Sequence, residues 1–177
     1  PADAQSGSLL GPAYGNAEIK TFLDSEGAIY RYYEDEDDLA KAVAGLIASE
    51  NVVGHVAGRM EFGPRALGAR SILGDARSPK MQSVMNLKIK FRESFRPFAP
   101  AVLREDVDEY FQMRPQEDSP YMLLVAPVRH EKRTADVSRK RGLDKLKELR
   151  SVVPAITHVD YSARVQTIDP ERAPRFY

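Results

Sequence analysis

The stretch that decides the fold is VVGHVAGRMEFGPRALGARSIL, residues 52–73. It opens with a short hydrophobic run, residues 52–56, which predicts a buried β-strand. The chain then passes through a segment in which glycines and a proline interrupt a series of arginines, and residues 70–73 predict a second strand. Because helical and strand patterns are mixed along the rest of the chain, we expect an α/β or α+β fold.

Short elements of alternating type are predicted on both sides of this stretch. The helical patterns cover residues 16–23, 35–49, 78–89, 105–111 and 143–149. The strand patterns cover residues 28–33, 98–103, 121–128 and 155–168, the last either continuous or bent at Asp160. Residues 35–38 are all acidic and begin a predicted helix, where negative charge suits the helix dipole. We interpret this acidic run as helix-end electrostatics rather than a metal site.

The composition indicates one soluble domain of ordinary character. Of the 177 residues, 42% are hydrophobic, which is enough for a core. We assign residues 1–15, rich in Gly, Ala, Ser and Pro, to a leader or linker, and residues 16–177 to the domain. No run approaches the roughly 20 apolar residues of a membrane span, and no signal peptide is evident. The absence of cysteine excludes disulfides and thiolate zinc sites, and we expect a cytoplasmic protein.

Charge is unevenly distributed although the net charge is zero. Residues 1–54 contain 3 Lys and Arg against 10 Asp and Glu, whereas residues 55–100 contain 9 against 3. A compact basic block inside a neutral chain predicts a local anionic ligand rather than general nucleic-acid binding.

The basic block has the residue types that bind phosphate. Guanidinium groups match phosphate oxygens with a fixed fork of donors, and nearby glycines allow the backbone amides to approach an anion. Four arginines fall in a stretch punctuated by glycines, and four further cations lie around three phenylalanines: Arg59, Arg65, Arg70 and Arg77, then Lys88, Lys90, Arg92 and Arg96 with Phe91, Phe95 and Phe98. We interpret the phenylalanines as core residues, with a wall for a nucleobase as the alternative. The pattern is neither a P-loop nor a dinucleotide fingerprint.

The sequence contains three histidines, each a candidate functional group. His55, at the end of the first strand, either polarises a bound group or makes a structural hydrogen bond. His130 lies in a charged segment and is expected to be solvated. His158 and Asp160 would share one face of a strand. With no evident third ligand, we expect a structural hydrogen bond there and no metal.

Three motifs together resemble the C-terminal domain of the NodU/CmcH-type carbamoyltransferases. They are residues 58–73 (GRMEFGPRALGARSIL), the segment 86–100 with its Phe-Arg-Pro-Phe-Ala-Pro end, and residues 158–167 (HVDYSARVQT). They occur in the order found in the family, and the first motif is long enough to be specific.

The resemblance implies a twisted, mixed sheet with flanking helices, similar to threonylcarbamoyl-AMP synthase of the YrdC type. It implies that ATP, Mg²⁺ and carbamoyl phosphate form carbamoyl adenylate and pyrophosphate. A separate N-terminal domain, holding iron or another metal, would then transfer the carbamoyl group to a hydroxyl. By position in the motifs, Lys90 and Arg96 would be catalytic. The ligand-binding candidates are Arg65, Ser162 and Arg164, with His55, Arg59, Arg70 and Glu61 as additional lining residues.

Two departures from the family pattern limit what the resemblance implies. Tyr161 replaces a common glycine, so a different backbone is expected there. The family domain also continues into an Asn-Thr-Ser-Phe-Asn segment, so we expect this chain to be truncated at its C-terminus and to lack the transfer domain. Two alternatives remain: an RNA-binding YrdC-like module, or an inactive fragment that serves as an inter-domain interface.

Overall fold

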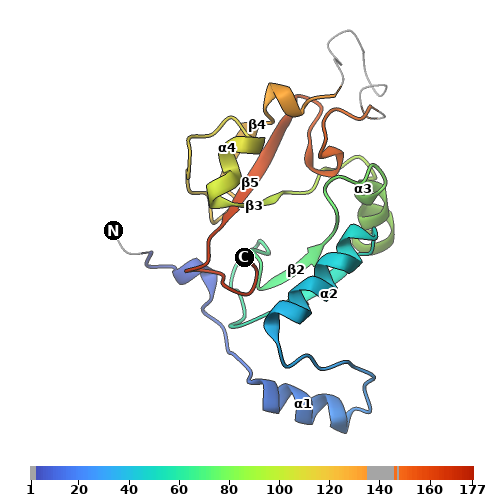
Figure 1. Cartoon of the computed structure of the whole chain (residues 1–177), viewed down its shortest axis with the longest axis vertical. Helices are drawn as coiled ribbons and strands as arrows, with labels where there is room; N and C mark the ends of the chain where they lie inside the picture. Colours follow the sequence, from blue (N-terminus) through green and yellow to red (C-terminus); the bar gives the residue numbers. More distant parts are fainter. Residues whose placement is uncertain (1–2, 135–145, 147) are drawn as a thin grey trace.

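The computed structural model of the chain describes residues 3–134, 146 and 148–177. This part of the chain contains a three-stranded sheet, a two-stranded sheet and several helices (Figure 1). The helices are α1 (Asn16–Ser25), α2 (Glu36–Ala48), α3 (Met81–Val84), the π-helix η2 (Met85–Lys90) and α4 (Val107–Tyr110). Short 3-10 turns are η1 (Ser6–Ser8), η3 (Arg104–Asp106), η4 (His130–Lys132) and η6 (Pro154–Ile156). The strands are β1 (Val53–Val56), β2 (Arg70–Leu73), β3 (Ala101–Leu103), β4 (Leu124–Pro127) and β5 (Ser162–Ile168). The predicted α+β class is confirmed.

The three-stranded sheet is mixed and has β5 at its centre. β3 runs parallel to β5, and β4 runs antiparallel to it on the other side. β1 and β2 form the second sheet as an antiparallel pair in which His55 lies opposite Ser71. α2 contacts β1, and Figure 1 shows it running along the two-stranded sheet. The glycine-rich stretch that connects β1 to β2 therefore lies at one end of this hairpin.

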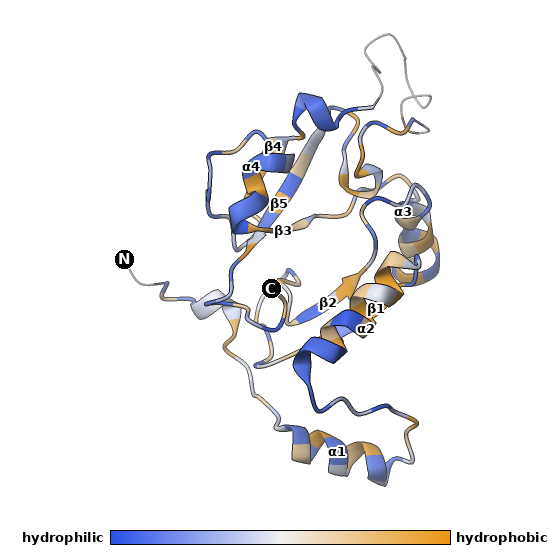
Figure 2. Ribbon diagram, viewed as in Figure 1, coloured by the Kyte–Doolittle hydropathy of each residue, from blue (hydrophilic) through white to orange (hydrophobic). Residues whose placement is uncertain are grey.

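The hydrophobic core has two parts joined by one aromatic ring. The larger part packs α4 against β4 and β5, and a smaller part lies beneath α3 and η2. The larger cluster contains Val107, Phe111, Ala126, Val128, Val153, Ile156, Ala163 and Val165, and the smaller contains Met81, Met85 and Ala155. Phe98 packs against both clusters. Val52 and Ile72 pack against the smaller cluster, and Figure 2 colours the end of β2 as hydrophobic. Phe98 therefore links the basic segment to the core.

The predicted helices at residues 16–23 and 35–49 are confirmed. Asp35 is the N-cap of α2, and one of its carboxylate oxygens accepts hydrogen bonds from the amides of Asp37 (2.7 Å) and Asp38 (3.0 Å). Such a cap satisfies amides that have no partner within the helix. The acidic run therefore works as the sequence predicted, at a helix end.

Three predicted elements differ from the structure. Residues 28–33 form no strand: Ile29 is fully exposed, and a strand needs a partner for its backbone groups. The helix predicted from residue 78 begins at Met81, because the Ser78 hydroxyl donates to Glu50 and caps the helix only weakly. The strand predicted over residues 155–168 is confined to β5, after the turn at 158–161.

The remaining predictions concern the ends of the chain and a charged segment. Residues 8–12, within the predicted leader, pair with the glycine-rich stretch through Phe62 N–H to Ser8 (2.8 Å) and Met60 N–H to Pro12 (2.8 Å). The predicted helix at 143–149 falls largely outside the described residues. Among the described residues, no helix has the length and apolarity that crossing a membrane requires.

Candidate functional site

The glycine–arginine loop, residues 57–69, folds around the carboxylate of Glu61. This side chain is buried, and it accepts hydrogen bonds from the amides of Leu67 (3.0 Å) and Ala69 (2.7 Å). The Gly68 amide donates to the Ser71 hydroxyl at 3.0 Å. Three consecutive amides that could have faced an anion are therefore already used within the loop.

Two of the predicted ligand-binding arginines, one in this loop and one at the start of β2, make contacts within the protein. Arg59 donates its Nε–H to the carbonyl of Gly11 at 2.8 Å and so fixes residues 8–12. Arg70 lies 3.4 Å from the Glu61 carboxylate and donates to the Gly63 carbonyl. Arg65 differs from both, since its half-buried guanidinium has no hydrogen bond or ion pair with any described residue. Within this loop, Arg65 is the cation that remains available to a ligand.

The basic loop, residues 86–96, is organised by the fully buried Asn86. The Asn86 amide donates to the carbonyls of Ser94 (3.1 Å) and Arg96 (2.7 Å), and its oxygen accepts from Arg92 Nε (2.6 Å). The Arg92 guanidinium also lies 4.8 Å from the centre of the Phe98 ring. Burial, followed by the nearby charge of Arg96, lowers the pKa of Arg92. Arg92 is therefore a structural cation.

The same loop presents Lys90 and Arg96 to solvent. Lys90 ends the π-helix and makes no ion pair with a described residue. Arg96 lies 3.2 Å from Glu93, but both side chains are more than half exposed, so this ion pair contributes little. π-Helical turns occur often at functional sites. The two predicted catalytic cations are thus accessible on a loop whose backbone is fixed.

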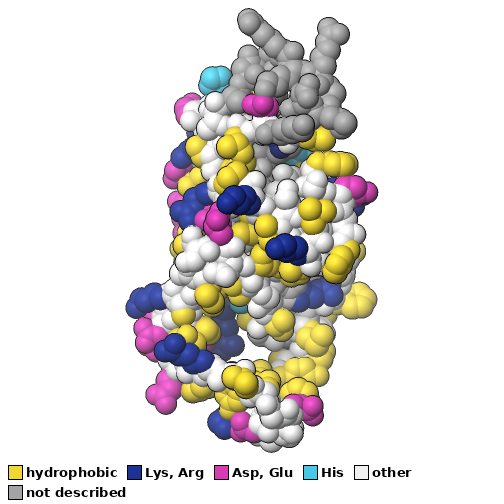
Figure 3. Space-filling model, turned by 90° about the vertical axis from the view of Figure 1, so that its right-hand side faces the viewer, with side chains coloured by type: hydrophobic (Ala, Val, Ile, Leu, Met, Phe, Trp, Pro, Cys, Tyr) yellow, Lys and Arg dark blue, Asp and Glu magenta, His cyan; other side chains and the backbone are white. Residues whose placement is uncertain are grey.

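The interpretation of the three phenylalanines as core residues is wrong for two of them. Phe98 packs against both clusters, whereas Phe91 is 86% and Phe95 50% exposed. They are exposed because Asn86 and Arg92 hold the loop against the core, which leaves its tip in solvent. Figure 3 looks at the side of the molecule where α3 lies and shows hydrophobic side chains at the surface beside Lys and Arg side chains.

The third motif places Ser162 and Arg164 at the start of β5. Ser162 donates its amide (3.0 Å) and hydroxyl (2.7 Å) to Asp160, and these bonds, the hydroxyl first, lower the pKa of that carboxyl. Arg164 lies between buried neighbours on the strand and is exposed, with no partner among the described residues. Tyr161 has φ +64°, the left-handed conformation that a glycine adopts readily. The turn before β5 therefore has a glycine-like backbone although it carries a tyrosine.

These three motifs fall inside a family profile that covers most of the chain. The profile of the carbamoyltransferase C-terminus matches residues 44–177. The chain belongs to the carbamoyltransferase C-terminus family. An uncharacterized protein of Synechocystis is 57% identical over 99% of this chain and 29% of its own length. Nodulation protein NolNO of Sinorhizobium fredii is 43% identical over 75% of the chain and 17% of its own length. Nodulation protein NolO of Bradyrhizobium diazoefficiens is 36% identical over 94% and 28%.

This carbamoyltransferase C-terminal chain therefore spans less than a third of the length of those relatives. The suspected membership in the NodU-type carbamoyltransferases is confirmed. The comparisons establish the family, and the structure shows where each predicted site residue lies.

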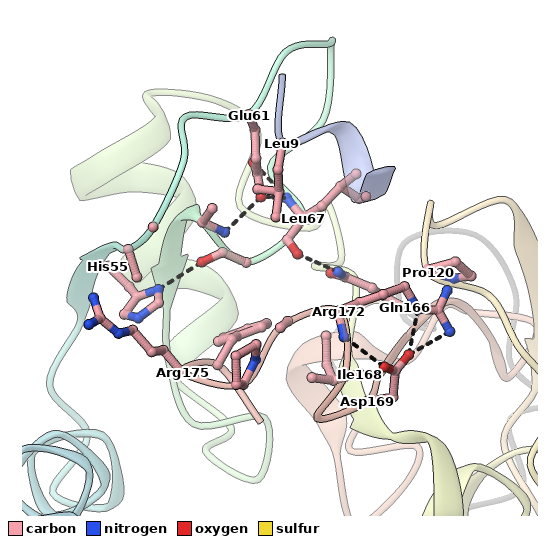
Figure 4. A pocket seen from close by; sticks show the side chains of 18 of the residues that line it. Leu9, His55, Glu61, Leu67, Pro120, Gln166, Ile168, Asp169, Arg172 and Arg175 are labelled. Atoms are coloured by element: carbon pink, nitrogen blue, oxygen red, sulfur yellow. Dashed lines mark hydrogen bonds and ion pairs between the residues drawn. The ribbon is translucent and has the colours of Figure 1, made fainter. Parts of the chain in front are cut away.

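His55 lines a cavity of about 230 Å³ to which no residue of the basic loop contributes (Figure 4). Its Nδ1 is 2.7 Å from the Gly68 carbonyl, which can only accept, so Nδ1 carries a proton, and Nε2 has no hydrogen-bond partner among the described residues. The ring stacks on Phe176, with centroids 5.5 Å apart. The structural reading of His55 is thus favoured by its geometry, although its open nitrogen remains at the cavity wall.

The charged side chains of this cavity are paired with protein groups. Asp169 and Arg172 form an ion pair at 2.5 Å, and Arg175 pairs with Glu36 of α2 at 2.9 Å. Burial opposes ionisation of Asp169, but the amide and guanidinium of Arg172 outweigh it and lower the pKa of the carboxyl. Because its charges already have partners, the cavity is a poor competitor for phosphate compared with the exposed cations of the basic loop.

Two organising residues were not identified from the sequence as such. Glu61 was considered only as a lining residue, and Asn86 only as the start of a motif. No sequence pattern marks Asn86 as buried, because the residues at helical spacing from it are Gln82, Ser83, Ile89 and Lys90, and only one of these is apolar. Among the described residues, no three His, Cys, Asp or Glu side chains come close enough to hold a metal ion.

Proposed function

We propose that this domain binds ATP and carbamoyl phosphate and forms carbamoyl adenylate, the activation half of an O-carbamoyl transfer. The observation that carries the proposal is a set of cations without an internal role, in a chain of the carbamoyltransferase C-terminus family. Arg65, Lys90 and Arg164 have no ion-pair partner among the described residues, and Arg96 has only an exposed one. Cations left without a structural role are the groups expected to bind phosphate.

The reaction requires that fixed cations meet developing negative charge. Hydrolysis of carbamoyl phosphate gives carbamate and inorganic phosphate. A carbamate oxygen then forms a bond to the α-phosphorus of ATP while the bond to the departing pyrophosphate breaks. Negative charge grows on the non-bridging oxygens and on pyrophosphate, so Lys90 and Arg96 would stabilise the transition state. Removing one such group costs on the order of 3 kcal/mol in the activation barrier.

The side chains present fit Mg²⁺ that arrives together with ATP. Mg²⁺ retains several waters and binds mostly through substrate phosphates in such sites, so a cage of protein ligands is not required. When bound, the ion neutralises part of the phosphate charge. Ionised carbamate needs no general base, and the residues proposed here act only by binding and orienting the phosphates.

Calorimetric titration tests the proposal directly. We expect heat on titration with ATP and Mg²⁺, a further change with carbamoyl phosphate, and at least a tenfold weaker affinity in Arg65→Ala. Arg114→Ala is the matched control, because Arg114 is highly exposed and, among the described residues, forms an ion pair with Glu117 alone. The proposal fails if neither ligand gives heat with the wild-type chain.

RNA binding is the second candidate, favoured by the exposure of Phe91 and Phe95 beside cations. Single-stranded RNA is bound through aromatic stacking and basic residues. Tight binding of a single-stranded RNA with no binding of ATP would replace the first proposal by this one.

A further inference from the structure

Phe91 has a backbone conformation that its side chain does not favour. It directly follows η2 with φ 48° and ψ 49°, in the left-handed region. Glycine or asparagine usually occupies this position at the end of a helix, because a β-carbon is strained there. A phenylalanine therefore ends the helix less well than a glycine would.

Packing within the described chain does not compensate for this strain. The residue is 86% exposed, and its ring makes no aromatic or cation contact with a described residue. Phe98, seven positions later, shows the contrast: it packs on both core clusters and faces Arg92. Strained residues persist mainly where function requires them.

Phe91 belongs to the same loop as two of the cations proposed to bind phosphate. Lys90 immediately precedes it, and the Arg92 amide donates to the Asn86 carbonyl at 3.1 Å just after it. Asn86 also fixes the carbonyl of Arg96. The ring and both cations thus belong to one pre-organised loop, and pre-organisation lowers the entropy lost on binding.

We infer that Phe91 is the stacking platform for the adenine base of ATP. The inference rests on the function proposed above and assigns the base, rather than the phosphates, to a residue. A base offers a π-face that stacks on an exposed aromatic ring, while the phosphates reach Lys90 and Arg96. Stacking of this kind explains both the exposure of the ring and the strained backbone that presents it.

The test separates the base from the phosphates. Affinities are measured for ATP and for tripolyphosphate, both with Mg²⁺, by calorimetry. The wild-type chain should bind ATP about tenfold more tightly than tripolyphosphate. Phe91→Gly should bind the two ligands equally, with unchanged affinity for tripolyphosphate and a melting temperature at or above that of the wild type, because glycine relieves the strain.

Two further variants sharpen the result. Phe91→Trp should retain the preference for ATP, because a tryptophan offers at least as large a π-face. Phe22→Ala is the matched control: Phe22 is 62% exposed on α1, and its loss should change neither affinity.

The outcomes distinguish this inference from the proposed function. If the wild-type chain binds neither ligand, the proposed function fails and this inference fails with it. If it binds ATP and Phe91→Gly keeps the wild-type ratio, the proposed function stands and the stacking role is wrong. An equal loss for both ligands would mean that the ring acts only through the loop conformation, which also overturns the inference. An adenine oligoribonucleotide that binds far more tightly than ATP, and depends on Phe91, would overturn it in favour of RNA.

Discussion

The glycine–arginine loop and the basic loop are both rich in cations, but they use them in opposite ways. The first folds around a buried carboxylate, Glu61, which draws in Arg70 and the backbone amides. The second folds around a buried neutral amide, Asn86, which holds carbonyls and one arginine and leaves Lys90 and Arg96 exposed. The buried charge of Glu61 forms an ion pair with a nearby arginine, whereas the neutral Asn86 leaves Lys90 and Arg96 exposed to solvent. The number of arginines in a segment therefore does not predict how many bind a ligand.

Removing the charged organiser should have the largest effect. Glu61→Ala leaves the amides of Leu67 and Ala69 without their acceptor and Arg70 without its ion pair. We expect a loss of about 3 kcal/mol or more in the free energy of unfolding, measured by urea denaturation. Glu61→Gln keeps one acceptor oxygen, so its free energy of unfolding should lie between those of the wild type and Glu61→Ala. Wild-type stability in Glu61→Ala would contradict the view that this loop is built on the carboxylate.

The second-largest effect is expected at Gly68, where the C-terminal segment packs closely on the glycine–arginine loop. A β-carbon on Gly68 would lie 2.5 Å from the Phe176 ring, and the backbone has φ +120°. Gly68→Ala should therefore cost about 2–3 kcal/mol, from strain and from displacement of that ring. Thermal denaturation measures the effect. Gly54→Ala on β1 is the matched control, because a β-carbon there meets no atom within 4 Å, and it should be nearly neutral.

Removing the neutral organiser should affect stability less and ligand binding more. Asn86→Ala deletes three hydrogen bonds from a buried site, and we expect a loss of about 2 kcal/mol in unfolding free energy. It also releases the backbone at Arg96, so ATP affinity should fall even where the protein remains folded. The control is the ATP affinity of Gly68→Ala, a variant of similar stability whose basic loop is unchanged. If both variants bind ATP equally well, the basic loop is not the binding element.

The features that the sequence predicted correctly depend on local interactions. The capped helix α2 and the strands β1 and β2 follow from residues close together in the chain, such as Asp35 with the amides it caps. The family followed from motifs whose residue order alone is specific. Which cations remain exposed could not be predicted in this way.

The features that could not be predicted from the sequence depend on contacts between residues far apart in the chain. Arg59 is taken by Gly11, 48 positions away, and no pattern within the loop indicates that contact. Phe91 was assigned to the core from its residue type, but its exposure is set by Asn86 and by a left-handed backbone. The predicted strand at 28–33 had the residue preferences of a strand but no partner. For the candidate site, the sequence indicates which cations to consider, whereas their division into structural and available cations depends on the tertiary structure.

The smallest effect concerns Glu93, the carboxylate that pairs with a cation of the basic loop. Glu93 lies 3.2 Å from Arg96, and both side chains are exposed. Glu93→Gln should change the unfolding free energy by less than about 0.5 kcal/mol, because exposed ion pairs contribute little. It should nevertheless tighten ATP binding severalfold at low salt, since it leaves Arg96 without a competing anion, and the gain should shrink as salt screens the charges. Glu117→Gln, which breaks the remote pair with Arg114, is the control and should leave ATP affinity unchanged. A Glu93→Gln variant that binds ATP no better at low salt would show that Arg96 does not contact the phosphates, and the contrast between the two loops would then rest on Lys90 alone.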